Sequence, residues 1–137
     1  MNIFIICSKK FYNNIPSIQK TLKTQGHRIT LPNSYDNPEA EEEIRKQGVK
    51  NHAAWKADMF AHSLSAIEKN DAVLVLNFDK KTGEKNYIGG ATFLEMYDAF
   101  RLGKKIFLYN PIPEGILRDE IIGFNPVVID GDLGKIK

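Results

Sequence analysis

The sequence has little of what marks several common protein classes. It contains one cysteine, Cys7, among 137 residues, which excludes an internal disulfide and fits a reducing compartment such as the cytoplasm. Its three histidines are scattered and no second cysteine accompanies them, so we expect no metal site. No apolar run approaches the roughly 20 residues that a membrane-spanning helix needs. We therefore expect a cytoplasmic protein that has no contact with a membrane.

The chain also has little excess charge. Its 19 Lys and Arg and 17 Asp and Glu residues leave a formal net charge of +2 at pH 7. A charge of that size does not favour binding to nucleic acid or to an anionic membrane. The length of 137 residues predicts one domain, residues 1–137, large enough to bury a substantial core.

Short apolar runs alternate with helix-like segments along the chain. Five runs predict buried strands, at residues 2–7, 27–31, 72–76, 105–109 and 126–129. Helical patterns lie between them, at about 12–24, 50–69, 91–102 and 117–122. Right-handed crossovers between parallel strands place helices on both faces of a sheet. The sequence therefore predicts an α/β single-domain three-layer sandwich with a five-stranded parallel sheet, of the flavodoxin-like or Rossmann-like type.

The segment 35–47 and the helix 50–69 need separate description. The acidic and then basic segment 35–47 is either a short solvated helix or a mobile flap, and both alternatives stay open. In the helix 50–69, the spacing of Trp55, Met59, Ala66 and Ile67 predicts a face directed towards the core.

The stretch from Asp71 to Tyr109 reads as strand, glycine turn, helix and strand. In such a unit, ligands bind at the carboxyl ends of the strands. Gly89 and Gly90 make either a tight connection or a backbone surface open to a ligand, together with the preceding Asn86 and Tyr87.

Glu95 lies in the first turns of the helix that leaves this edge of the sheet. Its neighbours in sequence are apolar. A solvated helix carboxylate and a functional one are equally compatible with this pattern.

Two further groups of polar residues belong to the same edge. Ser8, Lys9 and Lys10 follow the first strand, where they form either a phosphate site or a solvated turn. Asp58 and His62 are four residues apart on one helix, so they share a face, and Ser63 is adjacent. Such a pair is either a structural hydrogen bond or a catalytic dyad.

Four stretches of the chain together resemble the nucleoside 2-deoxyribosyltransferase-like superfamily, which includes the deoxynucleoside 5′-monophosphate N-hydrolases. They are IFIICSKK, GHRITLP, AIEKNDAVLVL and GGATFLEMYDAFRLGKKIFLY. The last one is the most specific, because it resembles the glycine turn, the glutamate-bearing helix and the following strand of that family. The chain is also similar to small bacterial proteins that carry NYIGG, LEM and NPIPE.

The resemblance implies roles for these residues. Glu95 matches the nucleophile that attacks the anomeric carbon and forms a glycosyl ester, as in a retaining glycosidase. Ser8 and Lys10 resemble the residues that hold the 5′-phosphate in the hydrolases. Ser63 stands where the transferases carry an acid, so Asp58 or His62 would have to assist the leaving base. The resemblance also implies a homodimer or higher homo-oligomer and no cofactor.

The sequence thus predicts an N-glycosidase that cleaves, or exchanges the base of, a nucleoside 5′-monophosphate or nucleoside. Gly89 and Gly90, with Asn86 and Tyr87, would shape the sugar pocket. The alternative is a non-catalytic module that binds a nucleotide or nucleotide sugar, which the serine at position 63 favours. A purely structural subunit is the least favoured prediction.

Overall fold

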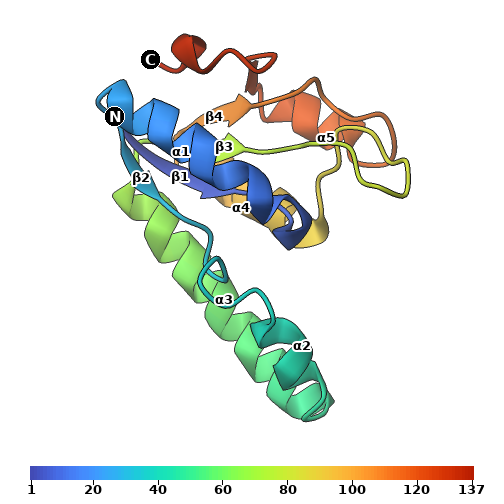
Figure 1. The fold of residues 1–137 in the computed structure, drawn as a ribbon. Helices are drawn as coiled ribbons and strands as arrows, with labels where there is room; N and C mark the ends of the chain where they lie inside the picture. The colour runs from blue at the N-terminus through green and yellow to red at the C-terminus, as the bar shows by residue number, and fades with distance from the viewer.

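The computed structural model describes all 137 residues as alternating strands and helices (Figure 1). The strands are β1 (Asn2–Ile6), β2 (Arg28–Thr30), β3 (Ala72–Val75), β4 (Lys105–Leu108) and β5 (Val127–Val128). The α-helices are α1 (Ile15–Thr24), α2 (Ala40–Arg45), α3 (Val49–Lys69), α4 (Gly90–Arg101) and α5 (Arg118–Gly123). Two 3-10 helices are η1 (Lys9–Asn14) and η2 (Leu133–Lys135).

All five strands form one parallel sheet in the order β2-β1-β3-β4-β5. This is the flavodoxin-like order, so the predicted fold class is confirmed. The chain runs from β1 outward to β2 and later from β3 outward to β4, in opposite directions across the sheet. The order therefore reverses between β1 and β3, and ligands of open α/β sheets bind at the carboxyl ends of the strands beside such a reversal.

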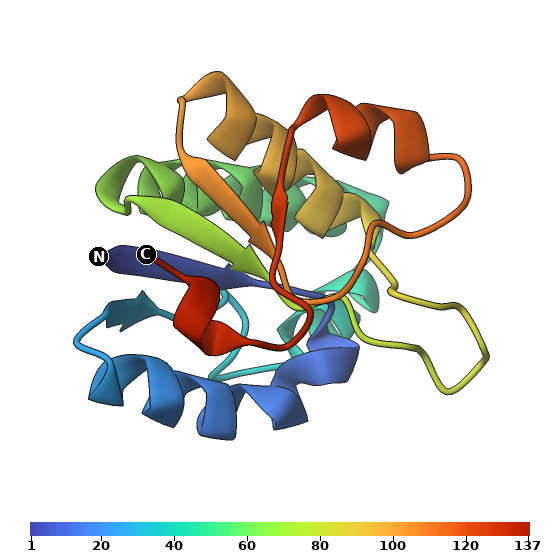
Figure 2. The same cartoon turned by 90° about the horizontal axis from the view of Figure 1, so that it is seen from above.

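Each face of the sheet is covered by its own layer, as the view from above shows (Figure 2). One core lies under α3, α4 and α5, where Ile67, Met96 and Ile121 pack against strand residues such as Val73. The other lies under α1 and the C-terminal segment, where Leu22 and Ile136 pack with their own set of strand residues. The continuous apolar runs of β1 and β3 follow from burial on both faces.

The segment after β1 differs from the prediction of one helix at about 12–24. It forms the 3-10 helix η1 first, with the Ser8 hydroxyl accepting a hydrogen bond from the Lys10 backbone N–H at 3.3 Å. The α-helix α1 begins only at Ile15, with Pro16 in its first turn. Proline is accommodated there because the first turn needs no backbone donor.

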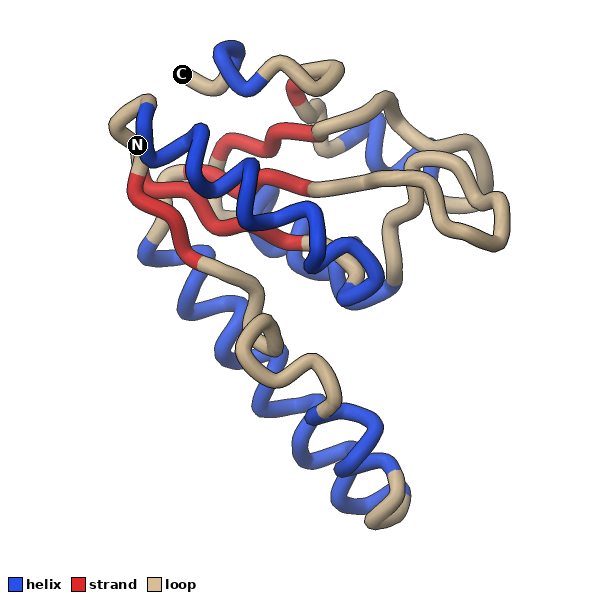
Figure 3. The backbone as a smooth tube through the Cα atoms, in the orientation of Figure 1, coloured by secondary structure: helices blue, strands red, loops and turns tan.

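Helix α3 is much longer than the sheet that it covers. Its 21 residues correspond to about 31 Å, whereas a four-residue strand such as β3 spans about 13 Å. The N-terminal half of α3 therefore extends beyond the sheet and pairs with α2 (Figure 3). Of the two alternatives for segment 35–47, the structure contains the short helix, α2.

The projecting half of α3 corrects one expectation about its core face. Ile67 is fully buried in the core, and Ala66 packs against it. Trp55 and Met59 are only partly buried, because they lie beyond the sheet and line a cavity instead.

Candidate active site

A cavity of about 260 Å³ opens at the carboxyl edge of the sheet, beside the reversal between β1 and β3. Four parts of the chain line it: the end of β1 with η1, the segment from the end of β2 into α2, the outer half of α3, and the start of α4. The residues used in the argument below are Cys7, Ser8, Lys9, Tyr12, Asn33, Glu41, Lys56, Ser63, Gly89, Gly90 and Glu95. Charged and apolar groups thus meet in one hollow.

Glu95 lies in this cavity on the second turn of α4. Its helix neighbours Thr92, Met96 and Ala99 are buried against the sheet, which leaves Glu95 at the border of the core face. Ser63 of α3 donates a hydrogen bond from its Oγ atom to Oε2 of Glu95 at 2.8 Å. The carboxylate is therefore held between two helices rather than extended into solvent.

This environment changes the acidity of Glu95. Burial raises its pKa to about 7, and the negative charge of Asp98 acts in the same direction. The hydrogen bond from Ser63 and the positive charge of Lys56 act against burial. Because the pKa lies close to neutrality, both the ionised and the protonated carboxyl are populated under physiological conditions. Perturbed carboxyls of this kind in a cleft are typical of functional sites.

Cys7 and Tyr12 line the same cavity from the other side. Burial raises the pKa of the Cys7 thiol to about 12, and the nearby charge of Glu95 adds to the effect. Burial also raises the pKa of the Tyr12 phenol, with further contributions from Cys7 and Glu95. Both groups are therefore neutral at physiological pH. A thiol in that state is a poor nucleophile, in agreement with a packing role for Cys7.

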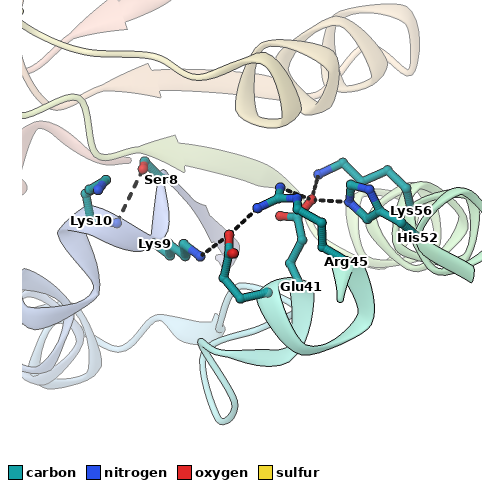
Figure 4. A network of polar contacts seen from close by, with 8 residues as sticks. Ser8, Lys9, Lys10, Glu41, Arg45, His52 and Lys56 are labelled. Atoms are coloured by element: carbon teal, nitrogen blue, oxygen red, sulfur yellow. Dashed lines mark hydrogen bonds and ion pairs between the residues drawn. The ribbon is translucent and has the colours of Figure 1, made fainter. Parts of the chain in front are cut away.

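A network of charged groups forms the outer wall of the cavity (Figure 4). Oε2 of Glu41 lies 3.1 Å from Lys56 Nζ and 2.9 Å from His52 Nε2, and Arg45 approaches it at 3.5 Å. Arg45 also pairs with Glu42, which lies 3.9 Å from the Nζ atom of Lys9. These contacts join η1, α2 and α3 around the opening.

Among the predicted site residues, Ser8, Ser63, Gly89, Gly90 and Glu95 are brought together in the cavity. Lys10 is not among the lining residues, and its neighbour Lys9 is. Figure 4 shows the Lys9 side chain directed towards α2 and the Lys10 side chain directed away. The 3-10 turn that begins at Lys9 separates the two side chains by about 120°.

Asp58 and His62 also lie outside the cavity, and both are exposed. Successive residues on an α-helix are rotated by about 100°, and the cavity face of α3 is centred on Met59 and Ser63. Asp58 and His62 each precede one of these two residues and turn towards solvent. The structure therefore does not place an acid from this pair beside Glu95, which corrects the expected position of both side chains.

Asn86 and Tyr87 lie at a separate hollow, of about 620 Å³, between their own loop and residues 111–117. Asp79 closes that loop by accepting hydrogen bonds from the Asn86 backbone N–H at 2.9 Å and from Lys85 Nζ at 3.2 Å. Asn86 adopts a left-handed conformation there, with φ of 51°. Neither residue lines the cavity of Glu95, although the Tyr87 ring packs beside Gly89, which does. The expected contribution of Asn86 and Tyr87 to the lining of the same pocket is therefore corrected.

Several lining residues were not singled out in the sequence, among them Tyr12, Asn33, Glu41 and Lys56. Asn33 follows β2, so its place at the carboxyl end of a parallel strand is a signal that points to this edge. Glu41 and Lys56 carry no such signal, because they reach the cavity only through the packing of α2 on α3.

No group of three or more His, Cys, Asp or Glu side chains is placed to hold a metal ion. No helix combines the length and the apolar character that crossing a membrane requires.

Comparison with known proteins gives a likeness to solved structures only. No protein-family model matches the chain, and no curated protein matches it. Among solved structures, the chain is similar to the Clostridium botulinum CMP N-glycosidase BcmB, with a TM-score of 0.49 and 16% sequence identity. The likeness covers 93% of this chain and 85% of that chain. At this identity it concerns the arrangement of the backbone only.

Proposed function

We propose that this chain is an N-glycosidase that acts on a nucleoside 5′-monophosphate or a related nucleoside, with Glu95 as the nucleophile. The observation that carries the proposal is a largely enclosed carboxylate, held by Ser63 at 2.8 Å, in a cavity at the ligand-binding edge of a flavodoxin-like sheet. The resemblance of the glycine turn and the following helix to the nucleoside 2-deoxyribosyltransferase-like superfamily supports the same role.

In the proposed reaction, a carboxylate oxygen of Glu95 attacks the anomeric carbon of the sugar. The bond between that carbon and the base nitrogen breaks, and its electron pair leaves with the base, which takes up a proton. A glycosyl ester on Glu95 results. Water then attacks the same carbon, loses a proton and releases the carboxylate, so the configuration is retained overall. A second base in place of water gives exchange instead of hydrolysis.

The buried position of Glu95 favours this chemistry. Burial disfavours the negative charge, which is why the pKa is raised to about 7. Formation of the ester consumes that charge and yields a neutral group. The unfavourable interaction present before attack is thus relieved as the bond forms, and only interactions that improve towards the transition state accelerate a reaction.

Cationic groups of the cavity suit a substrate phosphate. Lys9 and Lys56 both line the hollow, together with the Ser8 hydroxyl and the glycine-rich N-terminus of α4. Ammonium groups, hydroxyls and free backbone N–H groups at a helix N-terminus are phosphate ligands. We assign the role expected for Lys10 to Lys9, because Lys9 is the residue that reaches the cavity.

The departing base lacks a strong proton donor in this proposal. Ser63 occupies the position of the family acid, and its hydroxyl is directed to Glu95 rather than towards a base. A positioned general acid typically contributes about 10²- to 10⁴-fold to a rate. We therefore expect slow turnover, with bases that leave readily cleaved first.

Base release from a panel of nucleosides and nucleoside 5′-monophosphates tests this function. Glu95→Ala is expected to abolish release, and Glu95→Gln is expected to abolish it while retaining ligand binding. Glu68→Ala is the matched control, because Glu68 is exposed on α3 and its side chain has no ion pair. Full release by Glu95→Ala would remove the nucleophile assignment.

The second candidate function is a non-catalytic module that binds a nucleotide. Ser63 in place of an acid is the observation that favours it. Thermal-shift screening identifies a ligand for either candidate, because a bound ligand raises the melting temperature by mass action, and the fate of that ligand then separates the two. A ligand that stabilises the fold and stays intact for hours identifies the module.

We also infer that copies of the chain associate through α4, as the resemblance to oligomeric proteins implies. Leu94, Tyr97 and Phe100 of this helix are each nearly half exposed. Clustered exposed apolar side chains are common at protein interfaces. Light scattering of the purified protein, compared with Phe100→Ser, tests the inference, and an unchanged monomeric mass in both would exclude it.

A further inference from the structure

A chain of two hydrogen bonds leads from the surface to Glu95. Asn33, in the segment after β2, donates from its Nδ2 atom to Ser63 Oγ at 2.8 Å. Ser63 in turn donates from Oγ to Oε2 of Glu95 at 2.8 Å. Asn33 also donates to the backbone oxygen of Met59 at 3.3 Å. The three side chains come from the β2 loop, α3 and α4, so the chain connects three separate parts of the fold.

The direction of these hydrogen bonds follows from which groups donate. The Met59 carbonyl only accepts, so the NH₂ group of Asn33 must face it, and the second hydrogen of that group is directed to Ser63. Inside an α-helix, the same carbonyl also accepts the backbone N–H four residues on. It is then fully occupied, and the Ser63 hydroxyl has no reason to bond back to it. The single hydrogen of Ser63 is left for Glu95.

The second oxygen of Glu95, Oε1, takes no part in this arrangement. It has no hydrogen-bond partner in the chain, although every buried side-chain nitrogen or oxygen has one. Oε1 therefore keeps some accessible surface, and it is the oxygen of this largely buried carboxylate that is open to the cavity.

We propose that Asn33 and Ser63 are positioning residues for Glu95, in which Asn33 directs the Ser63 hydroxyl onto one carboxylate oxygen and leaves the other free to attack substrate. The proposal rests on the proposed function of Glu95 as nucleophile. It assigns to Ser63 an action on the enzyme carboxylate rather than on the leaving base. A hydrogen bond donated to the ionised form also stabilises that form, which opposes the effect of burial.

The other groups around Glu95 act on it without orienting it. Cys7 and Tyr12 face it from the end of β1 and from η1, and both remain neutral at physiological pH. Lys56 of α3 and Asp98 of α4 act through their opposite charges. None of these four donates a hydrogen bond to Glu95, so removal of the two positioning residues can be measured against a constant background.

The proposal can be tested by mutation, because Asn33 lies at the surface. Asn33 is exposed, so its replacement by alanine is not expected to disturb a core. Ser63 is buried, so Ser63→Ala removes the donor inside the fold and Ser63→Thr restores it. Asn37→Ala, in the same loop, and Ser65→Ala, two residues along α3, are matched controls because neither side chain makes a hydrogen bond.

The experiment follows the ionisation of Glu95 itself by NMR, with ¹³C-labelled glutamate carboxyls and Glu95→Gln to assign the signal. Ser63→Ala is expected to raise the titration midpoint of Glu95 by about one pH unit, a tenfold change in its ionisation constant. Asn33→Ala is expected to raise it by a smaller amount, and Ser63→Thr and both controls are expected to match the unmodified protein. A midpoint unchanged or lowered in both Asn33→Ala and Ser63→Ala would overturn the proposal.

Kinetics then separate the positioning role from the reaction itself. The acid limb of the pH profile of kcat is expected to shift to higher pH in the variants, in the same order as the NMR midpoints. KM is expected to change less than kcat. If no substrate is cleaved by the unmodified protein, the proposed N-glycosidase function fails while the NMR titration still decides the hydrogen-bond chain. If Ser63→Ala does not fold, Asn33→Ala decides it alone.

Discussion

The Oγ atom of Ser63 lies 2.8 Å from Oε2 of Glu95 and joins α3 to α4 at the wall of the cavity. This contact opposes burial, which raises the pKa of Glu95 to about 7. A carboxyl of this kind affects folding as well as chemistry, because its ionisation is easier in the unfolded chain.

Replacement of Glu95 by glutamine is therefore expected to stabilise the protein at alkaline pH. The pKa is raised from 4.5 in the unfolded chain to about 7 in the folded protein. The destabilisation is absent below about pH 4.5, grows between these values and is complete above about pH 7. Its upper limit is on the order of 3 kcal/mol, since each pH unit corresponds to about 1.4 kcal/mol. Urea unfolding of both proteins from pH 4.5 to 8 measures it.

Glu68→Gln is the control for this stability measurement, because Glu68 is exposed on α3. It is expected to follow the unmodified protein at every pH. Equal stability of Glu95→Gln and the unmodified protein at pH 8 would show that the Glu95 carboxyl is not buried as the structure describes.

The two neighbouring lysines after β1 are expected to differ in substrate binding. Lys9 lines the cavity, and Lys10 does not. Lys9→Ala should raise KM for a nucleoside 5′-monophosphate by about fivefold, which corresponds to about 1 kcal/mol for a partly exposed ion pair. Its effect on the matching nucleoside should be small, because the phosphate is absent.

Lys10→Ala serves as the control in the same measurement and should leave both KM values unchanged. A larger increase in KM for Lys10→Ala than for Lys9→Ala would show that Lys10, as expected from the sequence, binds the phosphate.

Cys7 is expected to resist alkylation in the folded protein. Its thiol pKa is raised from 9.0 to about 12, so the reactive thiolate is about 1,000-fold less abundant than in an unshifted thiol. Mass spectrometry after treatment with iodoacetamide at about pH 8 measures the rate. Modification should become fast in urea, and it should be faster in Glu95→Gln than in the unmodified protein, because the charge of Glu95 contributes to the shift. Rapid alkylation of the folded protein would contradict this account of the site.

The charged network at the cavity opening is expected to stabilise α2 against α3. Burial on its own would raise the pKa of Glu41, but hydrogen bonds from His52 and Lys56 outweigh it and hold the pKa below its usual value. Glu41→Gln should lower the free energy of unfolding by about 1 kcal/mol at neutral pH, because the cations Arg45 and Lys56 lose their anionic partner and the hydrogen bond with His52 is weakened.

The contribution of Glu41 is present above its unfolded-state pKa and is lost as the pH falls through the lower folded-state pKa. The difference between Glu41→Gln and the unmodified protein should therefore disappear in acid. Glu43→Gln, on the exposed side of α2, is the control. A difference that persists in acid would show that packing rather than charge is responsible.

The strand pattern made the fold predictable. The runs at β1 and β3 are apolar without interruption because both faces of each strand are covered, and few other structures produce such runs. The glycines before α4 and the carboxylate after them also pointed to the edge of the sheet at which the cavity opens. The apolar runs, the glycine turn and the carboxylate after it are all visible in short stretches of the sequence, so they could be recognised without the structure.

The rest of the site depends on packing that local sequence does not encode. Asp58 and His62 share a helical face, but its direction is set by how α3 meets α4 through Ser63 and Glu95. Lys9 rather than Lys10 lines the cavity, because the 3-10 turn η1 directs the two side chains apart. Contacts between elements at the edge of the sheet determine where these four side chains lie. Their positions could therefore be seen only in the folded chain.

Mass spectrometry of the protein quenched during turnover tests the central claim most directly. A 2′-fluorinated nucleoside 5′-monophosphate with a readily leaving base is the appropriate probe, because the fluorine slows hydrolysis of the glycosyl ester. The account predicts that the mass of one sugar phosphate is added to the unmodified protein, on the peptide that contains Glu95, and that Glu95→Gln gains none. Base release by the unmodified protein without any adduct, together with undiminished release by Glu95→Ala, would contradict it.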